Sequence, residues 1–93
     1  MTEESVAVVI PAFNEHETIA AVINSVAIYA TPVVVDDGSC DDTYEIAVAQ
    51  GAIVIKHKTN LGYEAALSSG LQEANRRGFI FAVTMDADGQ HNP

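Results

Sequence analysis

The regular alternation of short apolar runs with segments of helical periodicity constrains the fold more than any other feature. Runs rich in Val, Ile, Ala and Phe predict strands over residues 5–10, 33–35, 52–55 and 79–85. Apolar residues at helical spacing predict helices over residues 15–29, 43–50 and 62–77. Strands that alternate with helices through short connections form a parallel sheet with helices on its faces. The predicted fold class is therefore α/β, a Rossmann-like three-layer α/β/α domain with a mainly parallel sheet.

Residues at the ends of these segments add detail to the prediction. The first and last apolar runs are apolar at nearly every position, so both are expected to be buried strands. Pro11 is expected to close the first strand, because proline lacks the amide that a strand ladder uses. Asn14 is expected to cap the first helix, and Asp41 or Asp42 the second, since their short side chains accept hydrogen bonds from free helix amides.

The composition is that of one small folded domain, here predicted to span residues 1–93, with 48% apolar residues. The net charge of −9 argues against a nucleic-acid partner, which normally meets a basic surface. Cys40 is the single cysteine, so an internal disulfide is excluded and a reducing compartment is favoured. No segment resembles a secretory signal or a membrane span. A cytoplasmic location is therefore expected.

Carboxylates follow the predicted strands where a parallel sheet gathers its ligands. The loops after the four strands cover residues 11–15, 36–39, 58–62 and 86–91. In such a sheet these loops share one edge, and ligands bind outside the carboxyl ends of the strands. Helix capping explains Asp41 and Asp42 without a ligand, but it does not explain the remaining acidic residues of these loops, namely Asp36, Asp37, Asp86 and Asp88.

The last loop has the chemistry of a divalent-cation site. Asp86 and Asp88 could supply carboxylate oxygens and Gln90 a carbonyl, the hard ligands that Mg²⁺ and Mn²⁺ prefer. Taken alone, the same residues fit an ordinary solvated turn, because Asp and Gly dominate turns. His91 could orient a ligand or be a solvated loop residue, and Lys56, His57 and Lys58 are interpreted as a solvated turn.

Together the loops resemble those of the family 2 glycosyltransferases of the GT-A fold. The resemblance rests on the segments Val-Val-Ile-Pro-Ala-Phe-Asn-Glu (8–15), Val-Val-Asp-Asp-Gly-Ser (34–39), Asn-Leu-Gly (60–62) and Met-Asp-Ala-Asp-Gly-Gln-His (85–91). It is strongest to the branch with dolichyl-phosphate mannose and polyprenyl-phosphate glucose synthases, and it covers essentially the whole chain.

The resemblance implies a role for individual residues of these loops. It places the nucleotide-sugar against Pro11, Phe13, Glu15, Val35, Asp36, Asp37, Asp86 and Ala87. Among these, Val35 and Asp37 would hold the base and ribose, with Asp36 in support. Mg²⁺ or Mn²⁺ would be bound by Asp88 and Gln90, with Asp86 beside them. The catalytic base would lie beyond residue 93 and is not identified.

The implied function is transfer of a sugar from a UDP- or GDP-sugar to a polyprenyl or dolichyl phosphate. These residues would form the nucleotide-binding half of a longer enzyme, cut after the Asp-x-Asp motif, that works in the cytoplasm or at the cytoplasmic face of a membrane. The 93 residues alone are expected to be inactive and to self-associate through uncovered apolar surface. Two alternatives stay open: a non-catalytic nucleotide- or metal-binding module, and a nucleotidyltransferase.

Overall fold

The computed structural model describes residues 6–87, and all structural statements below concern that part of the chain. Its strands are β1 (Val6–Ala12), β2 (Thr31–Asp37), β3 (Ile53–His57) and β4 (Phe81–Thr84). Its helices are α1 (Ile19–Ala27), α2 (Thr43–Ala49) and α3 (Tyr63–Arg76). All strand pairs are parallel, in the order β3-β2-β1-β4. The predicted α/β class is confirmed.

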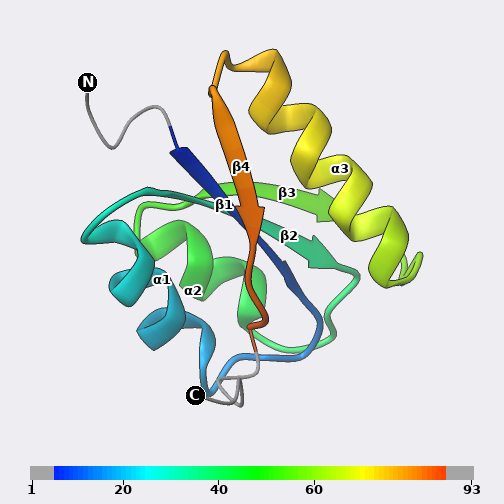
Figure 1. Ribbon diagram of the computed structural model, residues 1–93. Coiled ribbons are helices and arrows are strands. Elements are labelled where there is room, and N and C mark those ends of the chain that lie inside the picture. Colours follow the sequence, from blue (N-terminus) through cyan, green and yellow to red (C-terminus); the bar gives the residue numbers. More distant parts are fainter. Residues whose placement is uncertain (1–5, 88–93) are drawn as a thin grey trace.

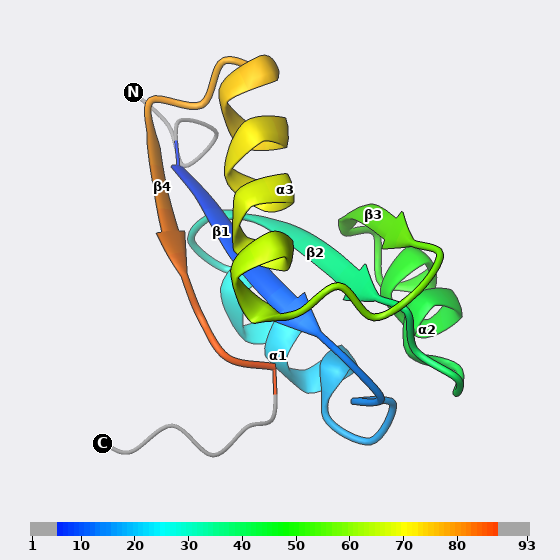
Figure 2. The same ribbon diagram turned by 90° about the vertical axis from the view of Figure 1, so that its right-hand side faces the viewer.

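The sheet lies between two helical layers. Figure 1 and Figure 2 show α1 and α2 on one face of the sheet and α3 alone on the other. Side chains of β1 and β2 alternate between these faces, as the period of a strand requires. Val8, Ile10 and Val34 belong to the core beneath α1, whereas Val9 and Val33 belong to the core beneath α3. The central strands are therefore buried on both sides, as predicted from their unbroken apolar runs.

Helix α3 packs unusually close to the sheet because Gly70 faces it. A Cβ atom at Gly70 would collide with the Val9 side chain and lie 3.1 Å from Cγ2 of Val35. Ala66 and Ala74, one turn away on either side, are also buried. Leu71, a large apolar residue next to Gly70, is 42% exposed. The fully buried stripe of α3 thus consists of small residues, and Leu67 packs beside it, partly buried.

Two predicted boundaries near the first loop are wrong. Strand β1 continues through Pro11 to Ala12. Strand β4 pairs only with Val6 to Val9, so beyond Val9 one side of β1 forms no strand-pairing hydrogen bonds. A proline, which has no amide hydrogen, is tolerated there. Helix α1 starts at Ile19 with Thr18 at the N-cap position, so Asn14 does not cap it. Asn14 instead has a left-handed φ of 55°, which turns the chain between β1 and α1.

Strand β4 is shorter and more exposed than predicted. It spans four residues, and all of them are exposed. The reason is its position: β4 pairs with β1 on one side and forms the edge of the sheet within residues 6–87 (Figure 2). An apolar run predicts a strand, but it does not distinguish a central strand from an edge.

None of the described helices is long and apolar enough to cross a membrane.

Candidate functional site

A pocket of about 320 Å³ opens at the carboxyl ends of β1, β2 and β4. This is the edge of a parallel sheet where ligands bind, and the volume lies within the range of small-molecule sites. Loops far apart in the sequence meet there. The lining residues are Pro11, Ala12, Phe13, Glu15, Asp37, Asn60, Gly62, Tyr63, Ala66, Asp86 and Ala87.

Of the eight described residues singled out from the sequence as site residues, six line this pocket and two do not. Pro11, Phe13, Glu15, Asp37, Asp86 and Ala87 are among the lining residues. Val35 and Asp36 are absent from the lining, and both are fully buried. Val35 packs in the core beneath α3. That Val35 holds the base and ribose, and that Asp36 supports this contact, stays a prediction.

Asp36 is a buried carboxylate without a hydrogen-bond partner. It is 0% exposed, and neither of its oxygens accepts a hydrogen bond from any described residue. It alternates with Asp37 along β2, so its side chain points to the face of α1 and α2, away from the pocket. Such unsatisfied groups are rare in folded proteins and cost stability.

Asp37, by contrast, accepts several hydrogen bonds on the pocket side of the sheet. Its Oδ1 accepts the backbone N–H of Leu61 and its Oδ2 that of Gly62, each at 2.9 Å. Its main-chain oxygen accepts the side-chain amide of Asn60 at 3.3 Å. The Asn-Leu-Gly segment is therefore the partner of the Asp-Asp segment, and together they form one wall of the pocket.

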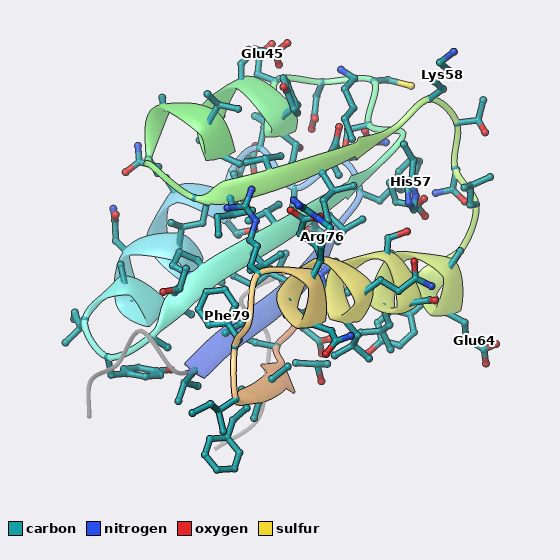
Figure 3. All side chains as sticks on the ribbon, turned by 90° about the horizontal axis from the view of Figure 1, so that it is seen from above. Glu45, His57, Lys58, Glu64, Arg76 and Phe79 are labelled. Carbon is teal, nitrogen blue, oxygen red and sulfur yellow. The ribbon has the colours of Figure 1, made fainter. Side chains whose placement is uncertain are left out.

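His57 contacts this wall through Asp37, although its segment was interpreted from the sequence as a solvated turn. His57 is the last residue of β3, paired in register with Asp37. Its Nδ1 lies 2.8 Å from Oδ1 of Asp37, and its Nε2 lies 2.8 Å from Oγ of Ser69 in α3. Figure 3 shows the ring at the end of β3, facing α3. The signal that could have revealed it is the strand register, which places the two residues side by side.

The environment of Asp37 favours its charged form. Burial opposes the charge, but the hydrogen bonds from His57, Leu61 and Gly62 outweigh burial and hold the pKa of this carboxyl below its usual value. An ionised carboxylate only accepts hydrogen bonds. Asp37 therefore presents an acceptor to the pocket.

The loop after β1 is tied to the loop after β2 by backbone hydrogen bonds. The Asn14 amide donates to Oγ of Ser39 at 2.8 Å, and Oδ1 of Asn14 accepts the Cys40 amide at 2.8 Å. The Glu15 amide donates to Oγ1 of Thr43, also at 2.8 Å. These contacts hold the Phe13 ring, which is 42% exposed, at the pocket.

Gly38 brings the loops after β2 and β3 into direct backbone contact. A Cβ atom at Gly38 would lie 2.5 Å from the backbone nitrogen of Asn60, and its φ of +80° also favours glycine. The Asp-Asp-Gly-Ser segment thus needs glycine at this position for close packing.

Asp41 lies one residue before the N-cap position of α2, and its carboxylate contacts the first turn of that helix. The N-cap position of α2 belongs to Asp42, whose side chain makes no cap hydrogen bond. The Asp41 carboxylate instead accepts the Thr43 amide at 3.0 Å and contacts Nδ1 of His16 at 2.7 Å. Burial opposes its charge, but hydrogen bonds from Thr43 and His16 lower its pKa to about 2.

Asp86 lies at the mouth of the pocket, where the chain leaves β4. The Met85 amide still donates to the Val9 carbonyl, at 3.0 Å, and Oγ1 of Thr18 donates to the Ala87 carbonyl at 2.5 Å. Asp86, held between these two anchors, is exposed to solvent.

The predicted metal ligands are only partly within the described chain. Asp86 is a hard oxygen donor at the pocket, which suits Mg²⁺ or Mn²⁺. Asp88 and Gln90 lie outside the described residues, as does His91. Residues 6–87 by themselves contain no group of three or more His, Cys, Asp or Glu that could hold a metal ion. Asp86 fits one position of such a site and leaves the others to the following residues and a ligand.

Comparisons with known proteins agree with this arrangement. A model of the family described as glycosyl transferase family 2 matches residues 7–93. The chain is 36% identical to the UDP-N-acetylglucosamine–dolichyl-phosphate N-acetylglucosaminyltransferase of Methanococcus voltae, with 100% of this chain and 45% of that protein covered. It is 38% identical to the polyprenol monophosphomannose synthase of Mycolicibacterium smegmatis, with 92% and 36% covered.

A solved structure has the same architecture. Glucosyl-3-phosphoglycerate synthase from Mycobacterium tuberculosis, in complex with Mn²⁺, UDP and glucosyl-3-phosphoglycerate, superposes with a TM-score of 0.74 at 32% identity. The match covers 90% of this chain and 33% of that one. The chain thus spans less than half of the length of these proteins. The resemblance drawn from the four loop segments is confirmed.

Proposed function

Because the chain belongs to glycosyl transferase family 2, we propose that its pocket binds the nucleotide-sugar donor of a sugar-transfer reaction. The observation that carries the proposal is the convergence of three separate motif segments on one pocket. Phe13 comes from the loop after β1, Asp37 from the end of β2, and Asp86 from the segment after β4. These residues are far apart in the sequence but meet at one pocket, which suits a ligand with several chemically distinct parts.

The nucleoside part of the donor fits the wall between Phe13 and Asp37. The exposed Phe13 ring offers an apolar surface for a base, and the Asp37 carboxylate accepts a hydrogen bond from a base N–H or a ribose hydroxyl. UDP is the nucleotide bound by the solved relative, and a UDP-sugar appears in the name of one curated relative. We take a UDP-sugar as the first donor to test, with a GDP-sugar as the alternative.

The diphosphate part of the donor belongs at Asp86. A divalent cation held there would neutralise the leaving diphosphate and stabilise the charge that develops on it. Asp86, Asp88 and Gln90 would hold the ion with donor oxygens completing the shell, and the solved relative binds Mn²⁺ with UDP. The choice between Mg²⁺ and Mn²⁺ is left to the titration below.

The proposed acceptor is a polyprenyl or dolichyl phosphate. The names of two relatives, a dolichyl-phosphate transferase and a polyprenol monophosphomannose synthase, support this class. Residues 1–93 would form the nucleotide-binding half of the enzyme, and the group that deprotonates or orients the acceptor would lie outside them. We therefore expect no sugar transfer by these 93 residues alone; turnover of UDP-glucose by the purified chain would contradict this.

Calorimetric titration of the chain with UDP and with GDP, each with and without Mn²⁺, tests the proposed site. We expect Mn²⁺-dependent binding that Asp86→Asn and Asp88→Ala weaken. The matched control is Glu45→Gln, which removes an exposed carboxylate from α2, away from the pocket (Figure 3). Equal loss of binding in the control and the Asp86 variant, or no binding by the folded chain, would overturn the proposal.

A further inference from the structure

His57 is a buried, doubly hydrogen-bonded side chain to which the sugar-transfer function assigns no role. Its side chain is only 10% exposed, and that of Asp37 is 6% exposed. One ring nitrogen contacts Asp37 and the other contacts Ser69, so the imidazole links the end of β2 to the middle of α3. His57 is not among the residues that line the pocket, so its link to the site runs through Asp37.

The lone pairs of Asp37 explain what this link does. Each carboxylate oxygen can accept two hydrogen bonds. Oδ1 receives the His57 ring at 2.8 Å and the Leu61 amide at 2.9 Å, so both of its positions are used. Oδ2 receives only the Gly62 amide, at 2.9 Å. A single acceptor position, on Oδ2, is left for the pocket.

The protonation pattern of the His57 ring follows from its partners. An ionised Asp37 can only accept, so Nδ1 must carry the proton that is donated to Oδ1. In the neutral ring Nε2 then has a free lone pair, which accepts the Ser69 hydroxyl at 2.8 Å. Asp37 thereby fixes the tautomer of the ring, and Ser69 helps to fix its orientation from α3, as outer partners do for ligand-binding histidines.

We propose that His57 is a positioning residue: by saturating Oδ1 of Asp37 it leaves Oδ2 as the one acceptor that the carboxylate offers to a bound nucleotide. This inference rests on the proposed nucleotide site. Without the ring, Oδ1 has an open acceptor position in a buried place, and the carboxylate is free to turn between its partners. The bound nucleotide then meets an Asp37 carboxylate whose orientation is no longer fixed.

Variants at position 57 separate the two ring contacts. His57→Asn places an amide nitrogen near the site of Nδ1, whereas His57→Gln places it near the site of Nε2, and His57→Phe keeps the ring without either nitrogen. We expect the Asn variant to bind UDP·Mn²⁺ nearly as the original chain does. The Gln and Phe variants should bind about tenfold more weakly, since a hydrogen bond to a charged group is lost. Rescue by Asn but not by Gln is a pattern that general loosening of the fold does not produce.

Calorimetric titration with UDP and Mn²⁺ gives the affinities, and NMR of the imidazole nitrogens gives the tautomer. Equal affinity in all variants, or equal loss in the Asn and Phe variants, overturns the positioning role but leaves the proposed nucleotide site intact. Failure of the original chain to bind UDP overturns both. A proton on Nε2 rather than Nδ1 of His57 overturns the inference without any nucleotide, so it remains testable even where the Phe variant does not fold.

Discussion

Asp36 and Asp37 are adjacent, both are buried, and we predict that the same substitution has opposite effects at the two positions. Asp36 is 0% exposed and Asp37 is 4% exposed. Asp37 accepts hydrogen bonds from His57, Leu61 and Gly62, whereas no described residue donates to Asp36. Replacing Asp with Asn changes charge and hydrogen bonding at nearly constant shape, so the contrast isolates the partners of each carboxylate.

The expected magnitudes follow from those partners. A buried polar group without a partner costs about 1–3 kcal/mol, and more when it is charged. Asp36→Asn breaks no hydrogen bond to a described residue and leaves a group that cannot ionise in this buried place, so the free energy of unfolding should rise by about 1 kcal/mol. Asp37→Asn turns an amide NH₂ toward at least one of three donors and leaves it unpaired, so the free energy of unfolding should fall by about 2–3 kcal/mol.

Urea denaturation at neutral pH measures both changes, provided that the slope of each transition stays constant. Glu45→Gln on the exposed side of α2 is the control and should lie within about 0.5 kcal/mol of the original chain. A loss of stability in Asp36→Asn comparable to that in Asp37→Asn would refute the reasoning, because it would require a favourable partner for Asp36. UDP titration of the same variant tests the expectation that Asp36 supports the nucleotide contacts.

Packing, charge and edge exposure each give a further prediction. Gly70→Ala should lower the free energy of unfolding by about 1–3 kcal/mol, because the added Cβ collides with Val9; Ser68→Ala, exposed on the same helix, is the control in urea. The pKa of Asp41 is lowered to about 2 in the folded protein. Its ionised carboxylate therefore stabilises the fold fully above the pKa of Asp in the unfolded chain, and this stabilisation is lost as the pH falls through the pKa of the folded state. As the pH is lowered between these two pKa values, the urea midpoint of Asp41→Asn should therefore fall less than that of the original chain. An equal fall in both proteins would argue against this role of Asp41. Phe81→Lys places a charge on the exposed edge strand and should reduce self-association in sedimentation velocity, whereas unchanged sedimentation would remove β4 as the contact.

The existence of every strand and helix could be predicted because hydrophobic period is a local property of the sequence. The start of α1 could not. Its first turn is displaced to Ile19 because the Glu15 amide donates to Thr43, 28 residues away, and Asn14 turns through a left-handed conformation. The exposure of β4 could not be predicted either, because the sequence of a single strand does not determine the position of that strand in the sheet.

The site was largely predictable because topology alone brings the strand ends together. The sequence analysis assigned both Asp36 and Asp37 to the nucleotide site. The two-residue period of a strand, however, places adjacent side chains on opposite faces of the sheet. His57 was missed for a different reason. Its lysine neighbours are typical of a solvated turn, and its burial depends on the register that pairs it with Asp37. Local composition therefore predicted the acidic residues and missed the group that orients one of them.

Carboxylates that cluster at one edge of a sheet repel one another unless a cation or hydrogen-bond donors offset their charge. Within residues 6–87 that repulsion is offset by the protein itself: Asp37 has three internal donors, Asp41 contacts Thr43 and His16, and Asp36 points to the other face of the sheet. Among the described carboxylates that line the pocket, Asp86 is exposed, Glu15 is half-buried and Asp37 is buried.

A divalent cation should therefore be needed for the diphosphate and Asp86, but not for folding. We predict that excess EDTA leaves the urea midpoint of the chain unchanged while it abolishes calorimetric binding of UDP. The physical reason is that a metal stabilises a fold only where it binds the folded state in the absence of other ligands, and a single described carboxylate is a weak site for that. A clear fall in the urea midpoint on chelation would show that the ion is structural and that the acidic edge depends on it.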